Sequence, residues 1–296
     1  MAQSEIEAIR VLLASKPRPV GWTERRQRIE EVGSVWPVAT DVAIKPFVAD
    51  GVAGEFSIVP GSDTSKVLLF FHGGGYCSGS LVSHRRMVTE AGRAFGARTL
   101  AIAYRLAPEN PFPAALDDAL GAWRFLRNSG VDAQKIVVGG DSAGGGLTLA
   151  LLQHLRDAGE ELPACAWLVS PWTDLTLSGA TLLSKDSADP IIHKPYLEEL
   201  AQAYVPFGMD RKDPRLSPLF ANLRGLPPLL IQVGSEETLL DDAVRFAGAA
   251  GADQVAANLE IWPQMIHAWP MWNAHLQAGR DALSHAGAFI GLHIPR

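Results

Sequence analysis

A serine flanked by glycines is the residue whose surroundings most clearly suggest chemistry. The pattern Gly140-x-Ser142-x-Gly144 follows a short apolar run, 136–138, and precedes a helix-forming run, 147–156. A serine at the apex of a sharp strand-to-helix turn is held in a strained backbone, and only small neighbours two residues away avoid a collision. The free N–H groups at the start of the helix would stabilise negative charge on a reacting oxygen. The pattern therefore predicts a nucleophilic serine.

Two other uses of a glycine-rich turn fit this stretch less well. A Walker phosphate loop needs a lysine after its last glycine, and no lysine follows Gly144. A dinucleotide loop needs Gly-x-Gly-x-x-Gly after a strand, and residues 140–145 do not supply it in that context. From this motif alone, a glycine-rich turn with an incidental serine stays open.

A serine hydroxyl is a weak nucleophile at neutral pH, so it needs a general base that a carboxylate orients. After this type of turn the partners follow in the order acid, then histidine. His154 lies inside the helix after Ser142, and His193 lies in a polar segment between prolines. His267 lies in a short loop after a predicted strand that ends at Trp262. The position after a strand predicts His267 as the base.

The acid should follow the strand before that one, where four carboxylates occur. Asp241 and Asp242 fit the first turn of the next helix, where the helix dipole favours acidic residues. Glu236 and Glu237 lie in the loop itself and reach a histidine more easily. Sequence periodicity does not choose between the two glutamates.

A second glycine-rich stretch, His72-Gly73-Gly74-Gly75, follows the continuous apolar run 67–71. Glycines allow backbone N–H groups to approach a ligand closely. Together with the N–H of Ala143, these groups would form an oxyanion hole. A flexible loop or a phosphate cradle explains the stretch equally well in isolation, but its pairing with the serine motif favours a hydrolase.

The rest of the chain must supply the elements that position these residues. Residues 1–36 predict two helices before any strand, with Arg25, Arg26 and Arg28 on a solvated face. Buried runs then alternate with amphipathic helices, which predicts a mainly parallel sheet covered on both faces, with its ligand site at the carboxyl ends of the strands. We expect strands at 38–48, 51–59, 66–71, 99–104, 135–139, 164–169, 228–233 and 257–262, and helices at 82–95, 114–128, 239–250 and 271–291, with a polar insert at about 172–225.

Composition narrows the function classes. A chain of 296 residues that is 47% hydrophobic can form one large α/β domain. A net charge of −6 argues against nucleic acid or an anionic membrane as partner. Cys77 and Cys165 lack metal-site spacing and predict free thiols in a reducing, cytoplasmic compartment, with no metal. We find no secretion signal and no apolar stretch long enough for a membrane span.

Several motifs together resemble one family. The chain is similar to the hormone-sensitive-lipase-like branch of the α/β-hydrolases, the bacterial family IV carboxylesterases. The resemblance implies an α/β-hydrolase fold without a cofactor, in which residues 1–36 and an insert at about 172–225 form a helical cap on a catalytic domain of residues 37–296. The matching segments are His72 to Gly75 with Gly79-Ser80, Tyr104 to Glu109, Phe112 to Asp118, Gly140 to Gly145, and Ser170 to Leu175.

The resemblance also assigns roles. It implies Ser142 as nucleophile and His267 as base, with the N–H groups of Gly74, Gly75 and Ala143 as oxyanion donors. Relatives often carry Asp-x-Leu-x-Asp about thirty residues before the histidine; the run from Glu237 to Asp241 fits that frame, so Glu237 is the predicted acid and Glu236 the runner-up. Glutamate in place of aspartate, and Ala268-Trp269 where relatives often carry Gly-Phe, are departures from the family pattern. The aromatic residues expected at the substrate pocket are Trp22, Tyr76, Trp172, Tyr196, Phe207 and Trp269.

The resulting prediction is a serine carboxylesterase that hydrolyses short- to medium-chain esters through an acyl-enzyme. A lactone or amide hydrolase with the same triad is the alternative. A non-catalytic receptor on this fold is less consistent with the sequence, because serine, acid and histidine are all present. A homodimer through the last strand stays open if the edge of that strand is exposed.

Overall fold

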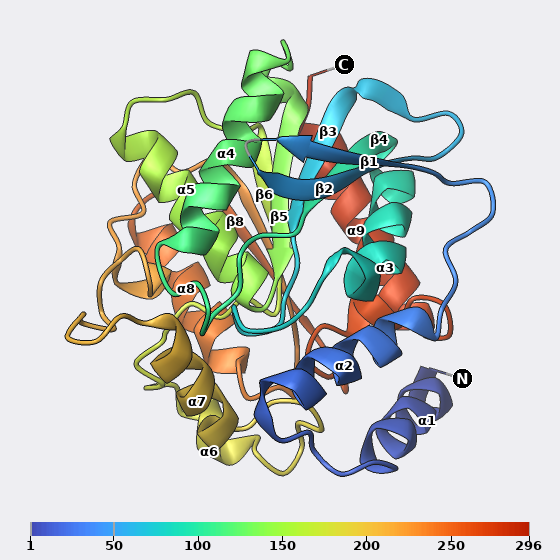
Figure 1. Cartoon of the computed structure of the whole chain (residues 1–296), viewed down its shortest axis with the longest axis vertical. Coiled ribbons are helices and arrows are strands. Elements are labelled where there is room, and N and C mark those ends of the chain that lie inside the picture. The colour runs from blue at the N-terminus through green and yellow to red at the C-terminus, as the bar shows by residue number, and fades with distance from the viewer. Residues whose placement is uncertain (1, 50, 296) are drawn as a thin grey trace.

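An eight-stranded sheet runs through the computed structural model, which describes residues 2–49 and 51–295 (Figure 1). The strand order is β1-β2-β4-β3-β5-β6-β7-β8. The β1–β2 and β2–β4 pairs are antiparallel, and the other pairs are parallel, which confirms the mainly parallel sheet. The strands are β1 Ala43–Ala49, β2 Val52–Ile58, β3 Asp63–Phe71, β4 Ala97–Ile102, β5 Ile136–Asp141, β6 Cys165–Val169, β7 Leu229–Gly234 and β8 Ala257–Trp262.

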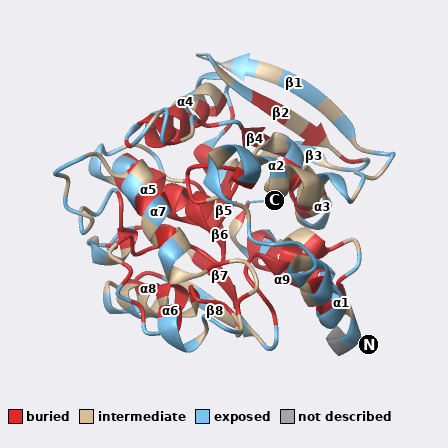
Figure 2. Cartoon of the chain, turned by 60° about the horizontal axis from the view of Figure 1, so that its bottom comes forward, coloured by how far each residue is buried: buried red, intermediate tan, exposed pale blue. Residues whose placement is uncertain are grey.

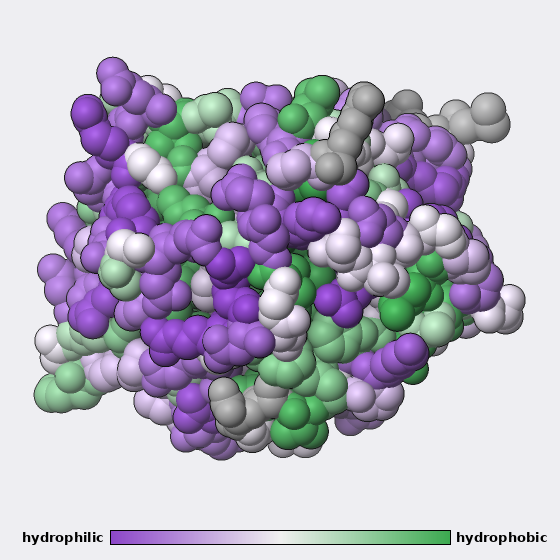
Figure 3. Space-filling view, turned by 90° about the horizontal axis from the view of Figure 1, so that it is seen from above, coloured by the Kyte–Doolittle hydropathy of each residue, from purple (hydrophilic) through white to green (hydrophobic). Residues whose placement is uncertain are grey.

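Helices cover both faces of this sheet. Alternate residues of β3 divide between two clusters: Leu69 packs with α4 and α5 residues, whereas Phe70 packs with α3 and α9 residues. Buried residues of α8 join the α5 face. The buried strands and α5 fill the centre of the molecule in Figure 2, and the face seen in Figure 3 is largely hydrophilic. These helices are α3 Leu81–Phe95, α4 Ala114–Asn128, α5 Ala143–Asp157, α8 Leu240–Ala252 and α9 Gln277–His293.

Two predicted elements begin several residues later than expected, whereas the other bounds differ by three residues or fewer. The first strand begins at Ala43 and not at residue 38, because a turn precedes it in which Val42 N–H donates to Ala39 O at 3.1 Å. The last helix begins at Gln277 and not at 271, because a short 3₁₀ helix, η3 Trp269–Trp272, takes up the apolar residues ahead of it. Bulky apolar side chains of η3 are buried. In the sequence, their spacing resembles that of the first turn of a longer helix.

The remaining helices gather at one end of the molecule, although they come from distant parts of the sequence (Figure 1). They are α1 Ala2–Ala14 and α2 Gly21–Ser34 from the N-terminal segment, and α6 Thr181–Ser184 and α7 Lys194–Tyr204 from the predicted insert. Ile6 and Ile9 of α1 are buried in a cluster with Ile266 and Trp272. The first segment therefore packs directly beside the loop that carries His267.

The prediction that the arginines of α2 form a solvated face is wrong for two of them. Arg25 is only 9% exposed and pairs with Glu199 of α7. Arg26 donates to the carbonyl oxygens of Cys77 and Ala107 at 2.9 and 3.0 Å. Arginines that face solvent and arginines that pair with another part of the chain occupy the same positions on a helix. The sequence pattern therefore could not distinguish the two.

Candidate active site

Ser142 stands at the turn between β5 and α5. Its backbone has φ 54° and ψ −121°, the strained conformation expected at such a turn. A Cβ atom on Gly140 would lie 2.3 Å from the carbonyl oxygen of Gly144, and one on Gly144 would lie 2.0 Å from the carbonyl oxygen of Phe71. Both contacts are too short for any side chain, so the turn requires glycine at these two positions.

His267 and Glu237 form a buried pair at the carboxyl ends of β7 and β8. His267 Nδ1 lies 3.0 Å from Glu237 Oε2. Glu237 Oε1 accepts hydrogen bonds from Gly234 N–H at 2.6 Å and from the Ser170 hydroxyl at 2.7 Å. Glu237 is fully buried, whereas the carboxylate of Glu236 is about 30% exposed and contacts Lys185 at 3.4 Å. Of the two glutamates, only Glu237 is in hydrogen-bond contact with His267.

Burial and charge act in opposite directions on this pair. Burial opposes the charged imidazolium of His267, but the hydrogen bond and charge of Glu237 outweigh it, so the pKa of His267 is raised above its ordinary value. Burial also raises the pKa of Glu237, although the contact with His267 and the Ser170 hydroxyl act against that rise. The two side chains therefore stabilise a proton on the histidine.

The loop after β3 is held beside Ser142 by a carboxylate. Gly73 N–H donates to Asp141 Oδ1 at 2.9 Å, and Asp141 Oδ2 lies 3.3 Å from His84 Nε2. Burial opposes the charged form of Asp141, but His84 beside it outweighs burial and lowers the pKa of the carboxyl group. In the described part of the chain, no residue accepts a hydrogen bond from the N–H of Gly74, Gly75 or Ala143.

Sequence reasoning missed this supporting group. The sequence analysis assigns no role to Asp141 or His84. His84 is held at the start of α3, where a capping box begins the helix and the Ser83 hydroxyl lies 2.8 Å from His84 Nδ1. No local sequence pattern links it to Asp141. His72 itself stays neutral, because burial lowers its pKa to about 3.

A cavity of about 480 Å³ opens over these groups. Its wall includes Gly74, Gly75, Ser142 and His267 from the sheet side, and residues of α1, α2 and α7 from the other side. Its volume is within the usual range for small-molecule sites, about 300–1,000 Å³. The cavity brings together the predicted nucleophile, base and two of the three predicted oxyanion donors.

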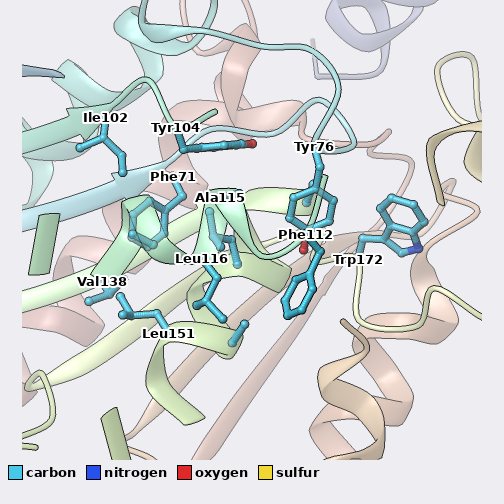
Figure 4. Close-up of a cluster of buried hydrophobic side chains, with 14 of the residues drawn as sticks. Phe71, Tyr76, Ile102, Tyr104, Phe112, Ala115, Leu116, Val138, Leu151 and Trp172 are labelled. Atoms are coloured by element: carbon cyan, nitrogen blue, oxygen red, sulfur yellow. The ribbon is translucent and has the colours of Figure 1, made fainter. Parts of the chain in front are cut away.

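The aromatic residues predicted for the pocket do not gather there. Of the six predicted aromatic residues, only Tyr196 lines the cavity. Phe207 is fully exposed, and Trp269 is fully buried in another cluster. Tyr76 and Trp172 are core residues (Figure 4), and Trp22 packs against that same core. These five assignments are corrected: aromatic residues of a large core and of a pocket look alike in sequence.

The other two candidate histidines differ in their position relative to the cavity. His154 is exposed on α5, away from the cavity wall, whereas His193 lines the cavity. Within residues 2–49 and 51–295, no group of three or more His, Cys, Asp or Glu side chains could hold a metal ion. No helix of that same part is long and apolar enough to cross a membrane.

Known proteins similar to this chain are named as esterases or acetyl-hydrolases. The sequence profile of the alpha/beta hydrolase fold family matches residues 68–271. An acetyl-hydrolase of Streptomyces hygroscopicus is 38% identical over 98% of this chain and 97% of its own length. An esterase of Acinetobacter venetianus is 33% identical over 89% of this chain and 87% of its own length.

Solved structures give the same assignment. An esterase from the bacterial hormone-sensitive lipase family superposes with a TM-score of 0.94 at 39% identity, covering 99% of this chain and 98% of that one. The protein EstE5, in a crystal soaked with p-nitrophenyl butyrate, superposes with a TM-score of 0.93 at 41% identity, covering 98% of each chain.

Proposed function

This chain belongs to the alpha/beta hydrolase fold family, in its bacterial hormone-sensitive lipase branch, and is a carboxylic ester hydrolase; from that premise we propose that Ser142, His267 and Glu237 are its catalytic triad. One observation carries the proposal. His267, which is paired with the buried Glu237, lines the same cavity as Ser142, and Ser142 stands at a strained turn. Glu237 takes the place of the aspartate that is common in relatives.

The reaction proceeds through an acyl-enzyme. The Ser142 hydroxyl attacks the ester carbonyl while His267 Nε2 takes its proton, because Nδ1 of that ring faces Glu237. His267 then gives the proton to the leaving alcohol, and the acyl group stays on the serine oxygen. Water enters next, His267 takes a proton from it, and the hydroxide formed attacks the acyl carbonyl. The carboxylic acid leaves and Ser142 regains its proton.

Backbone donors stabilise the negative oxygen that forms in both halves of this reaction. We assign this role to the N–H groups of Gly74, Gly75 and Ala143, which have no acceptor among the described residues. The hydrogen bond from Gly73 to Asp141 fixes the loop that carries the two glycine donors. Asp141 is therefore a positioning residue.

Residues 1–36 and 172–225 are proposed to act as a cap. Both segments contribute to the cavity wall opposite Ser142. A Cβ atom on Gly75 would lie 2.3 Å from Leu200 Cδ1 of α7, so the insert fits closely against the oxyanion loop. The cavity that the cap encloses favours short- to medium-chain esters over long ones.

A series of p-nitrophenyl esters from acetate to palmitate tests this function. We expect the highest turnover on short and medium chains, and we expect a serine-directed fluorophosphonate to add its mass to the peptide that contains Ser142. Labelling at Ser142 without turnover of any ester would point to lactones or amides as substrates of the same triad. Neither labelling nor turnover by the folded protein would point to a binding protein.

The pH dependence of kcat/KM follows from the raised pKa of His267. The base must be neutral to accept the serine proton, so activity falls as the pH drops through that pKa. Because the pKa of His267 is raised, we expect the acidic limb to have its midpoint above the ordinary histidine value of about 6.5. Initial rates at low substrate, measured across about pH 5–9, check this. A midpoint below the ordinary value would contradict it.

Two expectations from the sequence stay predictions. β8 is at the end of the sheet order and pairs with β7 on one side, so its other edge is free within the described residues. We propose that a homodimer, if one forms, uses this edge. The cytoplasmic location expected from the unpaired Cys77 and Cys165 is likewise a proposal.

A further inference from the structure

The cap side of the active-site cavity is positively charged, although the protein is acidic overall with a net charge of −6. Four cationic side chains and two carboxylates from the cap line the wall. Most substrate pockets are mainly apolar with a few placed polar groups, so an excess of cations has to be explained. The four cations of the cap wall are Lys16, Arg18, Arg25 and Arg28, and the two carboxylates are Glu31 and Glu199.

Three of the four cations have partners within the protein. Lys16 pairs with Glu31 at 3.1 Å. Arg25 pairs with Glu199 and also stacks on aromatic rings. Arg28 donates to a backbone carbonyl at 3.2 Å.

Arg18 is the exception. It lies in the segment between α1 and α2, it is exposed and lines the cavity, and no described residue forms a hydrogen bond or an ion pair with it. The two carboxylates of the cap wall form ion pairs with other cations, Glu31 with Lys16 and Glu199 with Arg25. The charge of Arg18 is therefore available to a ligand in the cavity.

His193 provides a second, independent observation. It also lines the cavity, and its Nδ1 is buried without a hydrogen-bond partner in the described part of the chain. His193 is at the N-cap position of α7, but its side chain makes no capping hydrogen bond. A ligand in the cavity cannot reach this buried atom. The other ring nitrogen, Nε2, is not buried and forms no hydrogen bond with a described residue, so a ligand can bind there.

Arg18 and His193 face the same part of the cavity. Burial lowers the pKa of His193, and the positive charge of Arg18 lowers it further, with Arg25 acting in the same direction and Asp186 and Glu199 opposing. His193 is thus neutral at pH 7. A neutral imidazole can donate one hydrogen bond, here from the accessible Nε2, and the nearby guanidinium of Arg18 supplies charge.

We propose that Arg18 and His193 form a subsite for a carboxylate group carried by the substrate, remote from the ester that Ser142 attacks. The preferred substrates are then half-esters of dicarboxylic acids and similar anionic esters. The charge of Arg18 would repel a cationic ester, and a neutral ester would have no carboxylate to accept a hydrogen bond from Nε2 of His193. This inference rests on the proposed function, because it uses the same cavity.

Two methyl esters of equal chain length test the subsite. Monomethyl suberate carries a distal carboxylate, and methyl octanoate carries a methyl group in its place; methanol release gives kcat/KM for each. We expect Arg18→Gln to lower the ratio of anionic to neutral kcat/KM about five-fold, the effect of one solvent-exposed charge contact. Arg18→Lys keeps the charge and should restore most of the ratio. Lys45→Gln, which removes an exposed cation of β1 outside the cavity, should leave the ratio unchanged.

Binding without turnover separates this inference from the proposed function. In the Ser142→Ala background, calorimetric titration with monomethyl suberate should show weaker binding when either Arg18→Gln or His193→Phe is added. High salt should weaken binding of the anionic ester only, because exposed charges are screened.

Two outcomes would overturn the subsite. Equal ratios for wild type, Arg18→Gln and Lys45→Gln would show that the carboxylate does not contact Arg18, while the esterase function would still stand. If no ester is turned over, the proposed function fails, and the titration still decides the subsite: unchanged affinity in both added variants would reject it.

Discussion

Ser142→Ala is expected to lower kcat for p-nitrophenyl butyrate by about 10⁶-fold, the loss seen when the nucleophile of a serine triad is removed. Without the hydroxyl there is no acyl-enzyme, so only the oxyanion donors and substrate binding would still act. The measurement is the initial release of p-nitrophenol by purified variant and wild type, with fluorophosphonate labelling of both.

The fold should survive this substitution. The Ser142 side chain makes no capping hydrogen bond, and alanine requires the same positive φ as serine. We therefore expect a thermal midpoint close to that of the wild type. Activity that persists in a folded Ser142→Ala variant would reject Ser142 as nucleophile.

The sequence predicted the main elements because their signals are local or periodic. The buried runs of β3, β5 and β6 are continuous, and α3 and α4 are amphipathic. The glycines around Ser142 mark the turn because any larger side chain would collide with carbonyl oxygens there. A signal of this kind needs no knowledge of the distant chain.

The choice between Glu236 and Glu237 is different, because it depends on contacts far apart in sequence. Neighbouring residues in a loop point in different directions, and which one reaches His267 depends on the path of the turn. Gly234 N–H and the Ser170 hydroxyl fix Glu237 in place, and Ser170 follows a different strand. No local pattern reports that Ser170 is close.

The substrate pocket was the least predictable part for the same reason. Its wall combines α1, α2 and α7, which meet only after folding. Aromatic residues gave the wrong answer because a core of this size uses the same residue types. The polar residues that do line the wall, Arg18 and His193, look like ordinary surface residues in the sequence.

Glu237→Gln is expected to lower kcat by about 10⁴-fold, because it changes the tautomer of the base. The side-chain oxygen of glutamine can keep the hydrogen bonds from Gly234 and Ser170, which places its amide NH₂ toward His267 Nδ1. That NH₂ donates to Nδ1, so the ring proton moves to Nε2. An imidazole with Nε2 protonated cannot take the proton of Ser142.

Glu236→Gln is the matched control, since it makes the same chemical change one residue away. The carboxylate of Glu236 is partly exposed and, among residues 2–49 and 51–295, contacts Lys185 and the neighbouring Ser235. Exposed ion pairs contribute at most about 1 kcal/mol to stability. Its kcat for p-nitrophenyl butyrate should remain close to that of the wild type. Thermal midpoints measured for both variants separate lost catalysis from lost folding. A large loss in Glu236→Gln beside a small one in Glu237→Gln would reverse the assignment of the acid.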